Sequence, residues 1–359
     1  MNSCSLANRT GEAAYTCGVR DKRANQGKTR GAEAGEDALL RKIKDAAGGG
    51  DTHSGIRLGV GDDAASWRPR SGFETILTCD WFLEGSHFLR DVHPSDAIGW
   101  KCLARAASDV AAMGGKPRCF LLSLALPESC AGEWLSGFLG GLKRASRKLG
   151  CVLAGGDTTR RREVLVNVTV IGEVRKGRAV LRSGARPGDR IFVSGKLGEA
   201  ELGLNLIRRG ERGGGQLSRM TQKHLYPEPR LALGQWLGEK RIATAMMDLS
   251  DGLSSDLARL CGASGVGARV LSGKIPMASN DFSKKFSAAE RLRAGLHGGD
   301  DYELLFCVAK SDAAKIAGKF LGIELTEIGE ITPGHKIKIF EPSGESRELT
   351  AEGWDPFRK

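Results

Sequence analysis

The sequence predicts a mixed α/β protein of two domains. It has 359 residues, of which 40% are hydrophobic, enough for packed cores in roughly two domains of about 150 residues each. Short apolar runs typical of strands alternate irregularly with amphipathic runs typical of helices, which favours α+β or mixed α/β over a regular βαβ array. The longest apolar runs, such as residues 119–126, are far shorter than the roughly 20 residues of a membrane helix.

The predicted ordered part begins near Glu36 with a helix over residues 37–47, where Leu39, Leu40 and Ile43 share one face. The next helix is long, with Ser95 as a candidate cap and a Gly-Gly pair at its end. In chain order, the elements predicted after the first helix are a strand at 74–82, a helix at 95–113, a strand at 117–126, a helix at 132–149 and a strand at 164–174.

Residues 182–189 are rich in Gly and Pro between two apolar runs, so they are the predicted linker. The expected domains are therefore residues 36–182 and residues 183–359. In the second domain the predicted strands are 190–194, 242–247, 303–308 and 336–340, and the predicted helices are 199–208, 230–239, 253–261 and 312–320.

Residues 1–35 are predicted to be a disordered basic tail, with six Lys or Arg against three acidic residues and no apolar period. They contain no apolar segment of the kind found in secretory signals. A misassigned start codon is an equal interpretation, and an organelle transit peptide has no support beyond the charge.

The nine cysteines include no CxxC pair and no ligand-like spacing with histidine. This pattern argues against a disulfide framework or a structural zinc site, and it favours a reducing cytoplasm. The net charge of +11 is spread along the chain without interleaved aromatic residues, so we expect no nucleic-acid and no membrane partner. An anionic small molecule fits the positive excess equally well.

Aspartates recur in short segments at the edges of apolar runs, most of them at predicted strand ends. Any single Asp-Gly pair is typical of a turn, but α/β proteins also gather ligand groups at strand ends. The six segments are Gly61-Asp62-Asp63, Thr78-Cys79-Asp80, Ser108-Asp109, Gly155-Gly156-Asp157-Thr158, Asp248-Leu249-Ser250-Asp251-Gly252 and Gly298-Gly299-Asp300-Asp301.

Asp109 lies in the last turns of its predicted helix, where the helix dipole disfavours a carboxylate. One interpretation is an exposed ion pair with Arg105, one turn earlier. The flanking alanines and Val110 instead suggest a buried helix, and a buried carboxylate needs a partner such as a divalent cation. Both interpretations stay open from the residues alone.

The segment from Asp248 to Gly252 leads into an amphipathic helix, so Ser250 or Asp251 can serve as its cap. Asp248 is not needed to cap this helix. Two carboxylates beside a helix N-terminus can hold Mg²⁺ while free backbone N–H groups face phosphate oxygens.

The sequence lacks a P-loop, an EF-hand loop, the protein-kinase motifs and a nucleophile elbow. Dispersed oxygen ligands suit Mg²⁺ and phosphate rather than zinc or iron. The residues alone therefore predict an enzyme that clusters aspartates around Mg²⁺ to handle a phosphorylated ligand.

In their order along the chain, the six aspartate segments resemble those of bacterial thiamine-monophosphate kinases. The resemblance extends from about residue 36 to the C-terminus and includes His87-Phe88 and Gly353-Trp354-Asp355. It implies the fold of the aminoimidazole-ribotide-synthetase-like superfamily, with an N-terminal α/β domain that dimerises through its sheet, a C-terminal α/β domain, and an ATP site where the two subunits meet.

The resemblance also implies roles for individual residues. His87, His297 and Trp354 match substrate-side positions, and Trp354 could stack on the thiamine rings. Asp109 and Asp251 are the expected catalytic residues. The implied Mg²⁺ ligands are Asp63, Thr78, Asp80, Asp109, Asp157, Asp248 and Asp251, and the implied ATP contacts are Gly156, Asp157, Arg182 and Ser250.

The implied reaction transfers a phosphoryl group from ATP to thiamine monophosphate, with several Mg²⁺ ions. A phosphate monoester is already a nucleophile at neutral pH, so no general base is required. Two alternatives stay open: a related enzyme that makes selenophosphate or aminoimidazole ribotide, and a basic nucleic-acid-binding module. Cys79 stands where the family often has Ser or Thr, and a thiol is a poor Mg²⁺ ligand.

Overall fold

The computed structural model describes residues 36–47, 55–211, 218–279 and 284–357. Residues Glu36–Lys359 form one compact unit. The expectation for residues 1–35 lies outside the described residues. Within the described part, no helix is both long enough and apolar enough to cross a membrane.

The N-terminal half is built on a four-stranded sheet with the strand order β3-β6-β4-β5. Only β4 and β5 run parallel, and the other neighbours are antiparallel. A small hairpin-like pair, β1 (Ile56–Leu58) and β2 (Ser66–Trp67), precedes it. The strand bounds are Phe73–Leu83 for β3, Lys116–Leu126 for β4, Val152–Arg160 for β5 and Leu165–Arg175 for β6.

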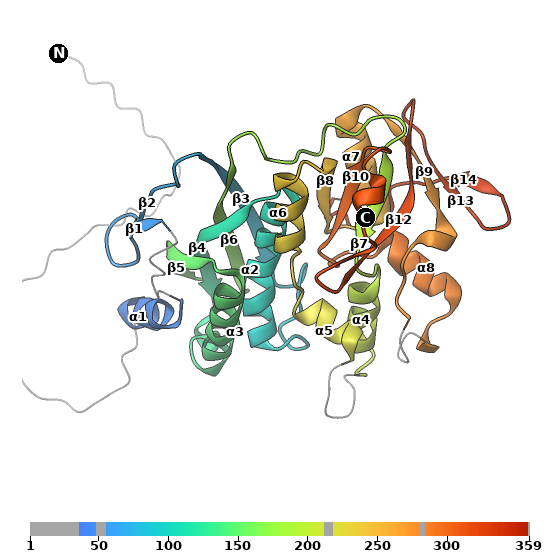
Figure 1. Cartoon of the computed structure of the whole chain (residues 1–359). Helices are drawn as coiled ribbons and strands as arrows, with labels where there is room; N and C mark the ends of the chain where they lie inside the picture. Colours follow the sequence, from blue (N-terminus) through green and yellow to red (C-terminus); the bar gives the residue numbers. More distant parts are fainter. Residues whose placement is uncertain (1–35, 48–54, 212–217, 280–283, 358–359) are drawn as a thin grey trace, which may run out of the picture. The chain divides into compact units, whose positions relative to one another are not determined.

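One face of this sheet is covered by helices α2 (Ser95–Ala112) and α3 (Glu133–Leu149), with α1 (Glu36–Ala47) beside them (Figure 1). The two helices pack closely at Gly99 because glycine has no side chain. A Cβ at this position would lie 1.9 Å from the carbonyl oxygen of Phe138. The predicted cap at Ser95 is wrong: Ser95 is the first helical residue, and no side chain caps the helix.

The other face of this sheet is open. Along β3 the side chains alternate, so Leu77, Cys79 and Trp81 lie on the open face while Thr78 and Asp80 face α2. Leu77 is 68% exposed and Trp81 is 55% exposed. The Cys79 thiol lies against Asn167, so it points away from the carboxylates that the sequence associated with it.

The C-terminal half is built on an eight-stranded sheet with the order β14-β13-β9-β12-β7-β10-β8, in which β11 also pairs with β12. Strand β10, which lies between β7 and the edge strand β8, is buried along its whole length. The strand bounds are Arg190–Ser194 for β7, Ala243–Leu249 for β8, Gly267–Leu271 for β9, Glu303–Val308 for β10, Lys319–Phe320 for β11, Ile323–Thr332 for β12, Ile337–Phe340 for β13 and Ser346–Glu348 for β14.

Helix α7 packs on one face of this sheet, while α6 and the end of α2 pack on the other. A Cβ at Gly234 of α6 would lie 2.0 Å from the carbonyl oxygen of Ala111 in α2, so these helices touch along their backbones. The helix bounds are Glu199–Arg208 for α4, Arg219–Leu225 for α5, Leu231–Glu239 for α6, Leu253–Ser264 for α7 and Ala288–His297 for α8. Helix α2 therefore lies between the two sheets.

The predicted helix at residues 312–320 is wrong. The segment forms a single 3-10 turn, Ala313–Lys315, followed by β11. Gly318 has a left-handed φ of 73°, and its carbonyl accepts a hydrogen bond from the amide of Leu325. The chain therefore turns back onto β12 where a helix would have to continue.

Candidate active site

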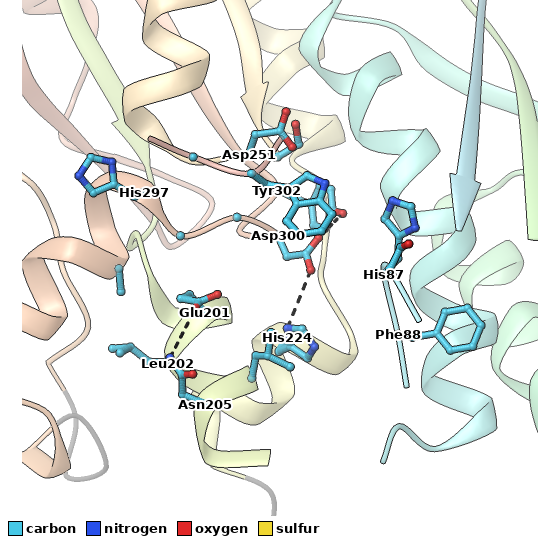
Figure 2. A pocket seen from close by; sticks show the side chains of 18 of the residues that line it. His87, Phe88, Glu201, Leu202, Asn205, His224, Asp251, His297, Asp300 and Tyr302 are labelled. Carbon is cyan, nitrogen blue, oxygen red and sulfur yellow. Dashed lines mark hydrogen bonds and ion pairs between the residues drawn. The ribbon is translucent and has the colours of Figure 1, made fainter. Parts of the chain in front are cut away.

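A cavity of about 1020 Å³ lies between the N-terminal and C-terminal halves. Figure 2 shows that His87 and Phe88 enter it from the N-terminal side, whereas Asp251, His297 and Asp300 enter it from C-terminal loops and helices. The two groups are separated by more than 150 residues in the sequence. The position of α2 between the sheets brings them together.

Four of the predicted ligand aspartates line this cavity. Asp80 projects from β3 toward α2, Asp109 lies near the end of α2, and Asp248 is buried near the end of β8 on the sheet face that meets α2. Asp251 follows in the loop before α7. The Thr78 hydroxyl donates a hydrogen bond to Asp109, which joins β3 and α2 directly.

These carboxylates perturb one another. Burial raises the pKa of Asp80 to about 6; Arg105 opposes this shift, and the charges of Asp109 and Asp251 add to it. Burial also raises the pKa of Asp248 well above its usual range, and the negative charge of Asp109 is the next largest cause of this rise. Grouped carboxylates with raised pKa values need a compensating cation when they ionise.

The donor set fits Mg²⁺, which prefers carboxylate oxygens and usually completes its coordination with water and phosphate oxygens. Among the described residues, no three His, Cys, Asp or Glu side chains already converge as a metal site. The chemistry therefore suits an ion held by one or two carboxylates together with a bound phosphate, rather than an all-protein cage.

The backbone N–H groups of the loop before α7 are not free. The Asp256 carboxylate accepts hydrogen bonds from the amides of Ser250, Asp251 and Gly252, at 3.1, 3.0 and 3.1 Å. Neither Ser250 nor Asp251 is the cap, because Gly252 takes that position with a φ of 106°. This arrangement frees the Asp251 side chain, which forms an ion pair with Arg259 and lines the cavity.

The three predicted substrate-side residues also line the large cavity. The His87 and Trp354 ring centroids lie 6.4 Å apart. The Trp354 amide donates to the carbonyl of Asp251 at 3.0 Å, so the C-terminal segment is fixed to the loop that carries a key carboxylate. His297 at the end of α8 exchanges a hydrogen bond with Ser254 at 2.9 Å.

A second cavity of about 430 Å³ adjoins the carboxylates. Thr78 and Arg182 line it, and Asp109 lines both cavities. The predicted ATP contact Ser250 lies in the large cavity instead. The two cavities thus meet at Asp109.

Asp63, Gly156 and Asp157 are exposed and line neither cavity. Asp157 lies on β5 and Asp80 on β3, at opposite edges of the four-stranded sheet. Three strand spacings separate the edges, about 14 Å. The register also places Asp157 level with Trp81 on the open face, whereas Asp80 faces α2. One chain therefore does not bring Asp157 to the other carboxylates.

Two cationic residues of the site were missed by the sequence interpretation. Lys101 is buried and forms an ion pair of 2.8 Å with Asp300, which also accepts a hydrogen bond from Tyr302. Arg105 forms an ion pair with Asp80 at 3.9 Å; the structure shows this pair where the sequence suggested Arg105 with Asp109. Lys101, Arg105 and Asp109 are spaced by four residues, and this period could have placed all three on one helical face.

The raised pKa of Asp80 predicts a pH-dependent stability in the absence of divalent cations. A folded-state pKa of about 6, above the ordinary 3.8, means that folding favours the protonated carboxyl. This contribution is fully present below about pH 3.8 and is lost as the pH rises through about 6. Urea unfolding in EDTA from pH 4.5 to pH 8 should show a shallower decline for Asp80→Asn than for the wild type. Parallel declines would contradict the burial of this carboxyl.

The fold and this site together define an AIR synthase related protein. The model of the AIR synthase related protein N-terminal domain matches residues 61–174, and the C-terminal domain model matches residues 186–341. The matches cover most of both sheets, whereas β14 and the cavity-lining residue Trp354 lie beyond them.

Comparison with individual known proteins identifies the family within this class. Thiamine-monophosphate kinase of Escherichia coli K12 is 36% identical over 306 residues, 84% of this chain and 92% of that protein. The crystal structure of thiamine-monophosphate kinase from Stenotrophomonas maltophilia K279a has a TM-score of 0.75 at 34% identity, covering 88% of this chain and 98% of that one. A structure of AaThiL complexed with AMPPCP and TMP has a TM-score of 0.70 at 32% identity, covering 92% and 100%. The chain belongs to the thiamine-monophosphate kinase family, which confirms the resemblance found in the sequence.

Proposed function

We propose that this chain transfers the γ-phosphoryl group of ATP to thiamine monophosphate and so forms thiamine diphosphate. The observation that carries this proposal is one cavity lined both by four carboxylates and by the aromatic pair of His87 and Trp354. A substrate with a cationic ring system and a phosphate group matches both sets of residues. The relatives that match most of the chain favour this reaction over selenophosphate or aminoimidazole ribotide synthesis.

In this proposal the chain's residues bind and orient two anionic substrates. Asp80, Asp109, Asp248 and Asp251 would hold Mg²⁺, which when bound offsets the repulsion between the phosphate groups and stabilises charge on the transferring phosphoryl group. Burial and then the charge of Arg105 lower the pKa of His87 to about 4, so His87 is neutral at pH 7. A neutral His87 tolerates a cationic thiamine ring beside it.

Arg182 and Thr78 line the second cavity next to Asp109, so we place the nucleotide there, with the γ-phosphate toward Asp109. The acceptor then occupies the large cavity, and the transferring group moves between the two cavities. The division into domains at residues 182 and 183 stays a prediction.

We also propose that the chain acts as a homodimer through the open face of the four-stranded sheet. This face exposes Leu77 and Trp81, and soluble proteins rarely leave such sheet faces uncovered. A second copy would bring its Asp157 and Asp63 toward the cavity that they do not reach within one chain. The cysteines in the described part of the chain are free thiols, which supports a reducing, cytoplasmic location.

The experiment that tests the function is a coupled assay of ADP release with ATP, Mg²⁺ and one acceptor at a time. The acceptors are thiamine, thiamine monophosphate, selenide and formylglycinamidine ribotide. Of the four acceptors, we expect only thiamine monophosphate to support ADP release. Release with selenide or the ribotide instead would assign the chain to one of the alternative reactions.

Trp354→Ala is expected to raise KM for thiamine monophosphate by about 3- to 30-fold with a small change in kcat, because the indole contributes ring stacking and cation–π attraction. Steady-state kinetics with thiamine monophosphate as the varied substrate measures this effect. Phe357→Ala is the matched control, because Phe357 is 94% exposed and does not line the cavity. An unchanged KM in Trp354→Ala would show that Trp354 has only a structural role.

A further inference from the structure

Arg105 is a buried cation with an unused hydrogen-bond donor. Its side chain is 15% exposed, lines the large cavity and comes within 3.9 Å of Asp80 without a hydrogen bond. Its Nε atom is fully buried, and no described residue accepts a hydrogen bond from it. Buried donors are nearly always paired. Arg105 has no hydrogen-bond partner among the described residues, so the part of its guanidinium that lines the cavity can take an acceptor from a ligand.

The charge of Arg105 acts on both groups of residues that line the cavity. It opposes the rise in the pKa of Asp80, which belongs to the carboxylate group. It also helps, after burial, to lower the pKa of His87. The guanidinium carbon also lies 5.3 Å from the centre of the Phe82 ring, which limits the positions of the side chain.

The other cations in or near the cavity are less suited to hold a ligand. Lys101 is engaged with Asp300 at 2.8 Å, and Arg208, Arg209 and Arg293 are exposed residues of the cavity lining. Arg182 lines the second cavity. A guanidinium offers a planar fork of donors that matches two phosphate oxygens, and Arg105 supplies such a guanidinium to the lining of the large cavity.

We propose that Arg105 binds the phosphate group of the acceptor and makes the site select a phosphorylated substrate over its unphosphorylated form. A ligand whose ring lies between His87 and Trp354 would have its phosphate near Arg105, with the carboxylates beyond. This inference rests on the proposed function for the identity of the acceptor, and on the unpaired Nε for the residue.

The test compares the affinities for thiamine monophosphate and thiamine, by calorimetry with Mg²⁺ present. Arg105→Met is expected to weaken binding of thiamine monophosphate by about 10- to 100-fold, because charge-assisted hydrogen bonds are lost, and to leave thiamine binding unchanged within about twofold. Arg105→Lys should weaken the binding of thiamine monophosphate less, because lysine keeps the positive charge but not the planar fork of donors. Arg90→Met is the matched control, since Arg90 pairs with Glu84 at 3.1 Å outside the cavity.

Equal losses for thiamine and thiamine monophosphate in both Arg105 variants would overturn the proposal, as would an increase in KM for ATP alone. Melting temperatures of the same samples identify a variant that is unfolded, and Arg105→Lys then carries the test. The outcome is separate from the function: if the wild type releases no ADP with thiamine monophosphate, the kinase assignment fails. A wild-type preference for thiamine monophosphate that Arg105→Met abolishes would still support Arg105 as the phosphate ligand.

Discussion

Asp109→Ala is expected to lower kcat by about 100- to 1,000-fold while the protein stays folded. Asp109 lines both cavities and accepts a hydrogen bond from Thr78, so in the proposed mechanism it lies where the two substrates meet. Its removal would take away one proposed Mg²⁺ ligand, and it would also reduce the repulsion that adds to burial in raising the pKa of Asp248. The apo protein should therefore retain its stability, whereas kcat falls. Steady-state kinetics at saturating Mg²⁺ and urea unfolding measure the two effects.

Asp251→Asn should lower kcat by a similar factor. The amide keeps the size of the side chain but removes its charge, and it weakens the ion pair with Arg259. Asp312→Asn is the matched control, because Asp312 pairs with Lys315 at 2.6 Å and lines neither cavity. If Asp109→Ala or Asp251→Asn keeps more than about half of the wild-type kcat at saturating Mg²⁺, that residue is not a metal ligand.

Periodicity predicted most elements, because their side chains are sorted by burial in a simple pattern. In helix α2 most residues are buried, and its sequence is correspondingly rich in alanine and apolar residues. Strand β5 was missed, because it contains Gly155 and Gly156, and such a pair is typical of a turn. Gly156 is required there, since a Cβ would lie 1.9 Å from the carbonyl oxygen of Leu122.

For the site, the sequence predicted that aspartates cluster, but not which of them one chain brings together. Asp80, Asp109, Asp248 and Asp251 lie together because α2 is packed between two sheets, and no local pattern contains this long-range arrangement. The hydrogen bonds that the Asp256 carboxylate accepts from three backbone amides were also not predictable, since Ser250 and Asp251 are both residue types that commonly cap a helix. A role for Arg105 in the site could not be predicted, because the sequence does not show which acidic residue lies opposite it in space.

The separation of Asp157 from Asp80 predicts that two catalytically dead variants can restore each other. If the active site combines the cavity of one subunit with Asp157 of the other, Asp157→Ala and Asp251→Asn are each inactive as homodimers. In a heterodimer, one site carries both substitutions and the other carries neither. Heterodimers isolated by two different affinity tags should therefore have about half of the wild-type kcat per dimer.

The matched control is the heterodimer of Asp109→Ala with Asp251→Asn. Both residues line the cavity of one chain, so each site of that heterodimer keeps one substitution, and no recovery is expected. The comparison depends only on strand order, because β3 and β5 lie at opposite edges of the same sheet. Absence of activity in the Asp157→Ala heterodimer would mean that each subunit works alone. Strong activity of the Asp157→Ala homodimer would instead mean that Asp157 has no part in the reaction.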